Sequence, residues 1–283
     1  MAILEVGAVV GLGLIGGSFA QACQGRGLFG ALWGVDADPR VLDQALAARA
    51  IDRALPGLDG LRDARFVLIA TPVGAIVPTV RALVPVLRAG TMLTDVGSVK
   101  APVVRAVDAL LPPHLSFVGG HPLAGGEQPG FAAASAGLFE GSRCILTPSA
   151  SSDLQSVEAV RQIWEALGAT VLPMAPEVHD RIVAATSHLP HLVAYALVAA
   201  VLAGGGPGAF MCSGGALRDL SRVAKSPPAM WRDIALLNRP RILTALDDFE
   251  AALQTIRAAL EQGDAAGLHA HLERAWQALA SLP

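Results

Sequence analysis

The sequence is poor in charge and in cysteine. Only 16% of its 283 residues are charged, and the formal net charge is −3. The chain therefore lacks the positive field that general nucleic-acid binders use. Its three cysteines, Cys23, Cys144 and Cys212, lie far apart and have neither metal-ligand spacing nor the even number of a disulfide framework. We expect a cytoplasmic protein that has no metal site and binds no nucleic acid.

Hydrophobic runs long enough to cross a membrane are also lacking. The N-terminus is apolar, but it has no basic segment, contains Glu5 and is interrupted by glycines, unlike a signal peptide. The other candidate, residues 189–203, is shorter than the roughly 20 residues of a membrane span and has Pro190 and His191 near its start. We expect this stretch to be a buried helix of a soluble protein.

Apolar residues are abundant: they make up 53% of the chain and can fill a large core. At roughly 100–200 residues per domain, the length predicts two domains. In the first part, short apolar runs typical of buried strands alternate with helical stretches. The runs lie at residues 6–10, 31–35, 66–70, 91–96, 116–118 and 144–146. This alternation predicts an α/β domain, Rossmann-like, with a mostly parallel sheet covered by helices on both faces.

The second part of the chain is predicted to be all-helical. Residues 177–202 are expected to form one long helix interrupted near Pro190, and three or four helices follow a glycine-rich break at 204–208. We therefore divide the chain into a dinucleotide-binding domain, residues 1–172, and a helical domain, residues 173–283. The helical part has more apolar residues than a small bundle buries, which predicts a homodimer formed through it.

A glycine-rich turn follows the first predicted strand. Gly11, Gly13 and Gly16 have the spacing of a dinucleotide fingerprint: the first permits the tight turn, the second lets a pyrophosphate approach, and the third lets the helix pack closely. The helix begins at Leu14 and Ile15, with backbone N–H groups facing the phosphates. Without the strand before it and the helix after it, the glycine spacing would be a weak signal, with an ordinary turn as the alternative.

Asp36 ends the second predicted strand, twenty positions after Gly16. A carboxylate at this place accepts hydrogen bonds from both ribose hydroxyls and repels a 2′-phosphate. The next residues, Ala37 and Asp38, offer no ligand to such a phosphate. The sequence therefore predicts NAD as the cofactor, in preference to NADP.

Two further polar residues follow strands that end at the same edge of the sheet. Thr71 comes after the run at 66–70, where the loop would pass under the cofactor, although Pro72 is equally a plain strand stop. Ser98 comes after the run at 91–96. Its hydroxyl either faces the cofactor and substrate or caps the next helix.

His121 lies in the most informative segment, Gly119-Gly120-His121-Pro122. We expect a rigid loop in which the glycines let a ligand approach closely. A histidine held there beside a nicotinamide is suited to act as general base at neutral pH. The alternative is a turn histidine bonded to the backbone.

The helical part adds candidate pocket residues. His188 and His191 are three positions apart and share a helix face, either as a hydrogen-bonded pair between helices or as metal ligands. Since no third well-spaced ligand accompanies them, we expect no zinc site. Arg222 is suited to bind a substrate carboxylate bidentately, or else is a surface residue paired with Asp219.

Together these segments resemble the prephenate/arogenate dehydrogenase family of tyrosine biosynthesis. The resemblance extends from residue 6 to about residue 238 and rests on five segments in the family's order: GLGLIGGS, TDVGSVK, GGHPLAGGE, SHLPH and RDLSRVAKSPPAMWRDI. Only GGHPLAG is specific by itself, but the ordered series is strongly specific. The chain departs mildly at residues 221–224, where it has Ser-Arg-Val-Ala and the family usually has Thr-Arg-Ile-Ala.

The resemblance implies a role for each matching residue. His121 is the catalytic histidine that bonds the ring hydroxyl of the substrate, Ser98 lies near that hydroxyl and the nicotinamide, and Arg222 binds a substrate carboxylate. Four residues match pocket positions with less defined roles: His188, His191, Glu127 and Trp231. Many members carry a regulatory domain or a fused mutase, and we expect neither here.

The reaction that the family implies is the NAD-dependent oxidative decarboxylation of prephenate to 4-hydroxyphenylpyruvate. The alternative substrate is arogenate, which has an alanyl side chain in place of pyruvyl. A 3-hydroxyacid dehydrogenase or imine reductase would place a lysine on the long helix, where this chain has histidines. A non-catalytic NAD sensor would not need both His121 and Arg222.

Overall fold

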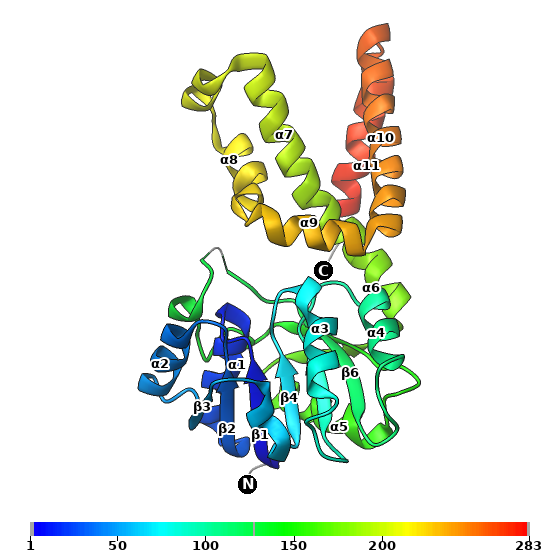
Figure 1. Ribbon diagram of the computed structural model, residues 1–283. Coiled ribbons are helices and arrows are strands. Elements are labelled where there is room, and N and C mark those ends of the chain that lie inside the picture. Colours follow the sequence, from blue (N-terminus) through cyan, green and yellow to red (C-terminus); the bar gives the residue numbers. More distant parts are fainter. Residues whose placement is uncertain (1–2, 127, 282–283) are drawn as a thin grey trace.

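The structure is a computed structural model that describes residues 3–126 and 128–281. It has two parts: a sheet with helices around it, and a group of helices that stands over one end of that sheet (Figure 1). Helix α6 (Pro176–Val183) lies at the junction and packs against both α4 and β7. Residues from both parts therefore meet at this end of the sheet.

Eight strands form one sheet in the order β3-β2-β1-β4-β5-β6-β7-β8. Every neighbouring pair is parallel except β6 and β7. The strands are β1 (Leu4–Val10), β2 (Phe29–Val35), β3 (Arg53–Leu55), β4 (Phe66–Ile69), β5 (Met92–Asp95), β6 (Ser116–Pro122), β7 (Arg143–Thr147) and β8 (Thr170–Pro173). The predicted mostly parallel sheet is confirmed. The strand order reverses between β1 and β4, and ligands of such sheets bind at the carboxyl ends of the strands flanking this point.

Helices cover both faces of the sheet because successive strand residues point to opposite sides. In β1, Val9 packs in a cluster with Phe19 and Trp164, whereas its neighbour Val10 packs with Ile76 on the other face. The first face is covered by α1 (Leu14–Arg26), α2 (Pro39–Ala47) and α5 (Leu154–Ala166), and the second by α3 (Val73–Leu83) and α4 (Ala101–Asp108). The buried strands thus carry apolar residues on both sides, as predicted.

The second part is helical, as expected. Helix α6 continues through a π-helical turn (Ala184–His188) into α7 (Leu189–Gly205), so the long predicted helix exists and is irregular just before Pro190. Four α-helices follow: α8 (Gly215–Ser221), α9 (Pro228–Leu237), α10 (Arg239–Gln262) and α11 (Ala265–Ala280).

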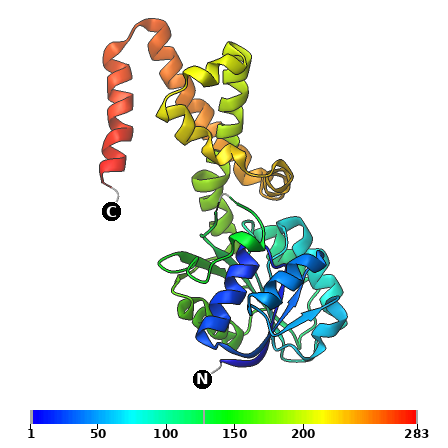
Figure 2. The ribbon, with the colours of Figure 1, turned by 90° about the vertical axis from the view of Figure 1, so that its left-hand side faces the viewer.

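This helical part has little core of its own. Among the residues that the structure describes, its buried cluster contains Ala184, Ile242 and Ala245, and α11 has no buried residue. Figure 2 shows α11 standing apart from the sheet. The expectation that residues 189–203 are buried is wrong for the single chain, because α8 and α10 cover only part of α7 and leave just Ala194 buried there.

The continuous helix Pro176–Gly205 is long and apolar enough to cross a membrane by length and composition alone, and no other such helix occurs among the described residues. One such helix is weak evidence, since core helices of soluble proteins pass the same test. Its first section, α6, is packed on the sheet part, where His179 and Asp180 are buried.

Candidate active site

The turn between β1 and α1 has a shape that fits a dinucleotide. Gly11 has a φ of +91°, and a Cβ on this residue would lie 2.7 Å from the carbonyl oxygen of Ala70. A Cβ on Gly16 would lie 1.9 Å from the carbonyl oxygen of Gly11, so only glycine permits this close helix–strand approach. A Cβ on Gly13 would meet no atom within 4 Å. The open side of the turn at Gly13 is where a pyrophosphate fits.

Helix α1 begins directly at this turn. Leu14 and Ile15 form its first turn and are half-buried. The N–H groups of a first helical turn have no partner within the helix and attract phosphate oxygens. The residue before them, Gly13, makes no side-chain cap. The turn and the helix start therefore offer backbone donors to an anionic ligand.

Asp36 lies beside the same turn, at the end of β2. One carboxylate oxygen accepts a hydrogen bond from the backbone N–H of Leu12 at 2.7 Å, and the other accepts one from that of Asp38 at 2.9 Å. These bonds fix the carboxylate against the glycine-rich turn. The sequence prediction that Asp36 and the glycines belong to one site agrees with this geometry.

Thr71, after β4, also contacts the turn. Its backbone nitrogen would lie 3.1 Å from a Cβ on Gly11. The Thr71 hydroxyl is buried and has no hydrogen-bond partner among the described residues. Buried hydroxyls are nearly always hydrogen-bonded, so this oxygen is a polar group that a ligand at the sheet edge would satisfy.

His121 lies within a strand, whereas the sequence predicted a loop. Strand β6 runs to Pro122 and pairs with β7, with His121 opposite Ile145. Gly119 and Gly120 have low strand propensity, but pairing with a neighbouring strand overrides propensity. Glycine is needed at position 120 because β5 comes close there: a Cβ on Gly120 would lie 2.6 Å from the carbonyl oxygen of Asp95.

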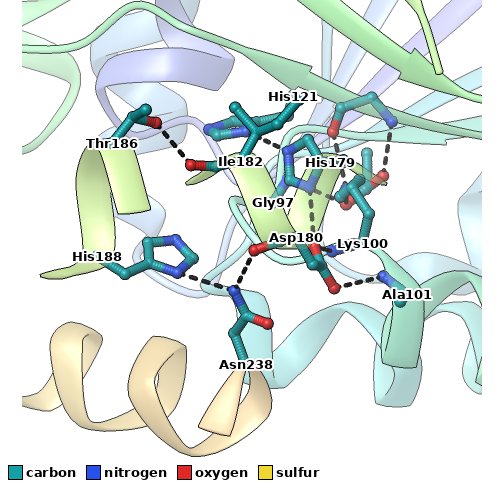
Figure 3. Close-up of polar contacts among 12 residues, drawn as sticks. Gly97, Lys100, Ala101, His121, His179, Asp180, Ile182, Thr186, His188 and Asn238 are labelled. Atoms are coloured by element: carbon teal, nitrogen blue, oxygen red, sulfur yellow. Dashed lines mark hydrogen bonds and ion pairs between the residues drawn. The ribbon is translucent and has the colours of Figure 1, made fainter. Parts of the chain in front are cut away.

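The His121 ring meets a histidine from α6 (Figure 3). Its Nδ1 atom lies 2.8 Å from Nε2 of His179, and the two rings are edge-to-face with centroids 5.1 Å apart. Nδ1 of His179 lies 2.7 Å from Oδ1 of Asp180. The sequence predicted neither His179 nor Asp180 as a site residue. The signal in the sequence that could have identified them is the periodicity of α6, which buries His179, Asp180 and Val183.

Asp180 also caps helix α4. Its two carboxylate oxygens accept hydrogen bonds from the backbone N–H groups of Lys100 at 2.7 Å and Ala101 at 2.8 Å. The alternative in which Ser98 caps this helix is therefore wrong: Lys100 occupies the N-cap position, and a side chain from another helix supplies the acceptor. Ser98 is half-buried, and its backbone lies close enough to His188 to raise the pKa of that side chain.

Lys100, whose side chain reaches the residue before His121, is completely buried. Its ammonium group pairs with the carboxylate of Asp95 and donates a hydrogen bond to the carbonyl oxygen of Gly120 at 2.8 Å. Asp95 accepts in return from the N–H of Gly120 at 3.0 Å. Burial lowers the pKa of Lys100, and the charge of Asp95 opposes this shift. Hydrogen bonds among Asp95, Lys100 and Gly120 thus connect the end of β5 to β6 at the residue before His121.

His121 is kept neutral by its surroundings. Burial lowers its pKa well below the ordinary value, and the positive charges that His179, Lys100 and His188 can carry act in the same direction. A neutral imidazole is the form of histidine that accepts a proton. The site therefore holds His121 ready to act as a base near pH 7.

Three aromatic rings, from the π-helical turn, α7 and α9, line the helical side of the site. The rings of His191 and Trp231 are stacked with centroids 3.8 Å apart, and His188 meets Trp231 edge-on at 6.0 Å. Nδ1 of His188 lies 3.1 Å from the side-chain nitrogen of Asn238. Nε2 of His188 and the indole nitrogen of Trp231 are buried without partners among the described residues.

The structure brings together most of the predicted pocket residues. His188 and His191 share one face, as expected, but each has its own partner, since His191 Nδ1 lies 2.9 Å from the carbonyl oxygen of Ser187. Arg222 is exposed, and it lies close enough for its charge to lower the pKa of His191, after the larger effect of burial. Glu127, also predicted here, falls outside the described residues.

Comparisons with known proteins identify the family. Residues 19–173 match the family model "Prephenate dehydrogenase, nucleotide-binding domain", and residues 175–274 match "Prephenate dehydrogenase, dimerization domain". The chain belongs to the prephenate dehydrogenase family. Its two matches meet between β8 and α6, where the sheet part passes into the helical part.

Individual relatives agree with this assignment. The chain is 38% identical to a prephenate dehydrogenase of Bacillus subtilis over 94% of this chain and 73% of that protein. A crystal structure of prephenate dehydrogenase from A. aeolicus in complex with hydroxyphenyl propionate and NAD⁺ superposes with a TM-score of 0.93 at 32% identity, covering 99% of this chain and 98% of that one. Synechocystis arogenate dehydrogenase gives a TM-score of 0.82 at 31% identity, with coverages of 95% and 97%.

Proposed function

We propose that the chain is an NAD-dependent prephenate dehydrogenase that converts prephenate to 4-hydroxyphenylpyruvate by oxidative decarboxylation. The single observation that carries this proposal is the position of the His121 ring at the carboxyl end of β6, 2.8 Å from His179, in a chain whose family is known. A base at this edge, on the same sheet as a nucleotide turn, is what oxidation of an alcohol requires.

The cofactor site is proposed to consist of the turn and the strand ends around it. Its residues are Gly11, Gly13, Leu14, Ile15, Gly16, Asp36, Thr71 and Ser98. The carboxylate of Asp36 would bind the ribose hydroxyls and repel the 2′-phosphate of NADP. When bound, NAD supplies the acceptor for the hydride that leaves C4 of the substrate ring.

His121 and Ser98 are proposed to act on the C4 hydroxyl group. His121 accepts its proton as the hydride leaves, and Ser98 holds the same oxygen by a hydrogen bond. Loss of CO₂ from C1 then makes the ring aromatic, so the overall reaction is effectively irreversible. A positioned base of this kind contributes about 10²–10⁴ in rate.

The remaining pocket residues are proposed to bind the two carboxylates and the ring of the substrate. Arg222 takes one carboxylate, because a guanidinium group binds it with two parallel hydrogen bonds. His188, His191 and Trp231 line the pocket with partnerless donors and aromatic faces. The resemblance to the family adds Glu127 to this set.

Arogenate is the second candidate substrate. Similarity to an arogenate dehydrogenase supports it, and the two substrates differ only in the pyruvyl or alanyl side chain. An ammonium group on that side chain would favour a carboxylate such as Glu127 near it. A 3-hydroxyacid dehydrogenase or imine reductase remains less well supported, because the long helix carries histidines in place of a lysine.

The helical part is proposed to form a homodimer in a cytoplasmic enzyme. Support comes from the match of residues 175–274 to a dimerization domain and from the three-residue core of this part in the single chain. We place the boundary between a dinucleotide-binding domain, residues 1–172, and the helical domain, residues 173–283. A second chain would cover the apolar faces of α7, α10 and α11.

The proposal is tested by following NADH formation with prephenate and with arogenate as separate substrates. We expect turnover with prephenate at a higher kcat/KM than with arogenate. A higher kcat/KM with arogenate would reassign the substrate. Absence of NADH formation with either compound would refute the dehydrogenase assignment.

A further inference from the structure

The hydrogen bonds around Asp180 fix where the proton of His179 lies. Asp180 accepts backbone N–H groups at both of its oxygens, from Lys100 at 2.7 Å and from Ala101 at 2.8 Å. Backbone N–H groups only donate, so both oxygens act as acceptors. Oδ1 also lies 2.7 Å from Nδ1 of His179. Nδ1 of His179 must therefore carry the hydrogen in this contact.

The position of the hydrogen on His179 determines the position of the hydrogen on His121. In its neutral form, His179 with its hydrogen on Nδ1 has a lone pair on Nε2, and the assignment that follows holds for this form. Nε2 of His179 lies 2.8 Å from Nδ1 of His121, so the hydrogen of that bond belongs to His121. The lone pair of His121 is then on its own Nε2. This is the nitrogen on the side of the ring away from His179.

We propose that His179 and Asp180 are positioning residues that hold His121 in the tautomer whose Nε2 accepts the substrate proton. The proposal rests on the proposed function for the identity of that proton. Neither residue needs to touch substrate: they act through His121, in the way that a buried carboxylate orients the histidine of a hydrolase triad.

Burial makes the chain of bonds effective. His179 is 0% and Asp180 2% exposed, so water does not compete for these contacts. The groups that face His121 and its partners come from several elements: Asp95 at the end of β5, Lys100 before α4, Cys144 on β7, and His188 at the end of the π turn. Of these, Lys100 and His188 disfavour a positive charge on His121. The neutral, tautomer-fixed form is thus favoured by both the hydrogen bonds and the charges.

A purely structural role for the pair must be distinguished from this one. Asp180 also caps α4 through its carboxylate, which joins the two parts of the molecule. Its backbone carbonyl accepts a hydrogen bond from the side chain of Asn238 at 2.9 Å, within the helical part (Figure 3). Loss of that structural role would weaken folding and binding. Loss of the positioning role would change the His121 tautomer and lower kcat.

The decisive measurement uses the unmodified protein. In ¹⁵N-histidine-labelled enzyme, NMR at pH 7 reports which ring nitrogen of His121 carries hydrogen, assigned by its disappearance in His121→Asn. We expect hydrogen on Nδ1 and a lone pair on Nε2. Hydrogen on Nε2 would overturn the proposal, whatever the substrate proves to be. This result does not depend on turnover, so it is separable from failure of the proposed function.

Two variants of His179 form a matched pair. In His179→Phe the ring is kept but the acceptor is lost, and we expect kcat to fall about 10²–10⁴-fold. In His179→Gln the side-chain amide can donate to Asp180 and accept from His121, so kcat should stay within about tenfold of the wild type. In both, KM for prephenate and the Kd for NAD should change less than about threefold. Equal losses of kcat in both variants, or an unchanged kcat in His179→Phe, would overturn the proposal.

Discussion

Nζ of Lys100 donates a hydrogen bond at 2.8 Å to the carbonyl oxygen of Gly120, the residue that directly precedes His121, and so places a buried ammonium group close to His121. Lys100 comes from the loop between β5 and α4, whereas Gly120 belongs to β6. Lys100 also pairs with Asp95, so the charged groups near His121 are held in place by the folded edge of the sheet.

The pH dependence of the reaction should reflect this charge. Because burial and then the charges of His179, Lys100 and His188 lower the pKa of His121, the base should stay neutral well below pH 6.5. We expect kcat/KM for prephenate to be flat from pH 7.5 to 6.5 and to fall only in more acid solution. In Lys100→Met, which removes a positive charge, the acid limb should move to higher pH. An acid limb that does not move would show that Lys100 does not control this pKa.

Replacing the base should separate chemistry from binding. In His121→Asn, we expect kcat to fall about 10²–10⁴-fold, because the variant lacks the proposed base. The Kd for NAD, measured by fluorescence or calorimetry, should be unchanged, since the glycine-rich turn is a separate element. Near-normal turnover would mean that another residue is the base.

Arg222 is expected to contribute to substrate affinity. Loss of a bidentate, charge-assisted contact in Arg222→Ala should raise KM for prephenate about 10- to 100-fold. Arg222→Lys is the matched control, because it keeps the charge and loses the paired geometry, and its KM should lie in between. Steady-state kinetics at saturating NAD provide the measurement. A KM that stays the same in the alanine variant would remove Arg222 from the substrate site.

Asp36 is expected to select between the two nicotinamide cofactors. Wild-type kcat/KM should be higher with NAD than with NADP, because the carboxylate binds the ribose and repels a phosphate. In Asp36→Ser this preference should shrink by about tenfold or more, which corresponds to about 1.4 kcal/mol. Initial rates with each cofactor decide the matter, and a wild-type preference for NADP would contradict the assignment.

Local patterns predicted the parts of the site that lie within one strand–turn–helix unit. The glycine-rich turn and Asp36 are of this kind, since their spacing alone places them together. His121 was recognised by its neighbours in sequence, although pairing with β7 makes it part of a strand. His179 and Asp180 could not be found this way, because their significance comes from contacts with residues about 58 and 80 positions away.

The helical part shows a second limit of sequence patterns. The apolar stretch at 189–203 predicts that a face of α7 must be covered, but not by which molecule. In the single chain only Ala194 of that helix is buried. Periodicity identifies the apolar face of α7, whereas the chain that we propose to cover this face, a second copy, cannot be identified from periodicity.

The stability of the fold should also depend on pH through His188. This side chain is 1% exposed, and burial lowers its pKa to about 4. In the unfolded chain its pKa is about 6.5, so between these values the unfolded state binds more protons than the folded state. The stability that the buried, neutral His188 contributes is therefore fully present above pH 6.5 and is lost as the pH falls toward 4. At pH 5 the loss relative to pH 7.5 is about 2 kcal/mol.

Urea unfolding of wild type and His188→Gln at pH 7.5 and pH 5 isolates the contribution of His188 to the free energy of unfolding, because the carboxylates titrate equally in both proteins. The wild type should lose about 2 kcal/mol more than the variant over this interval. Equal losses would mean that His188 becomes protonated as readily in the folded protein as in the unfolded chain. In that case its buried Nε2 atom must have an acceptor in the assembled enzyme that the single chain does not provide.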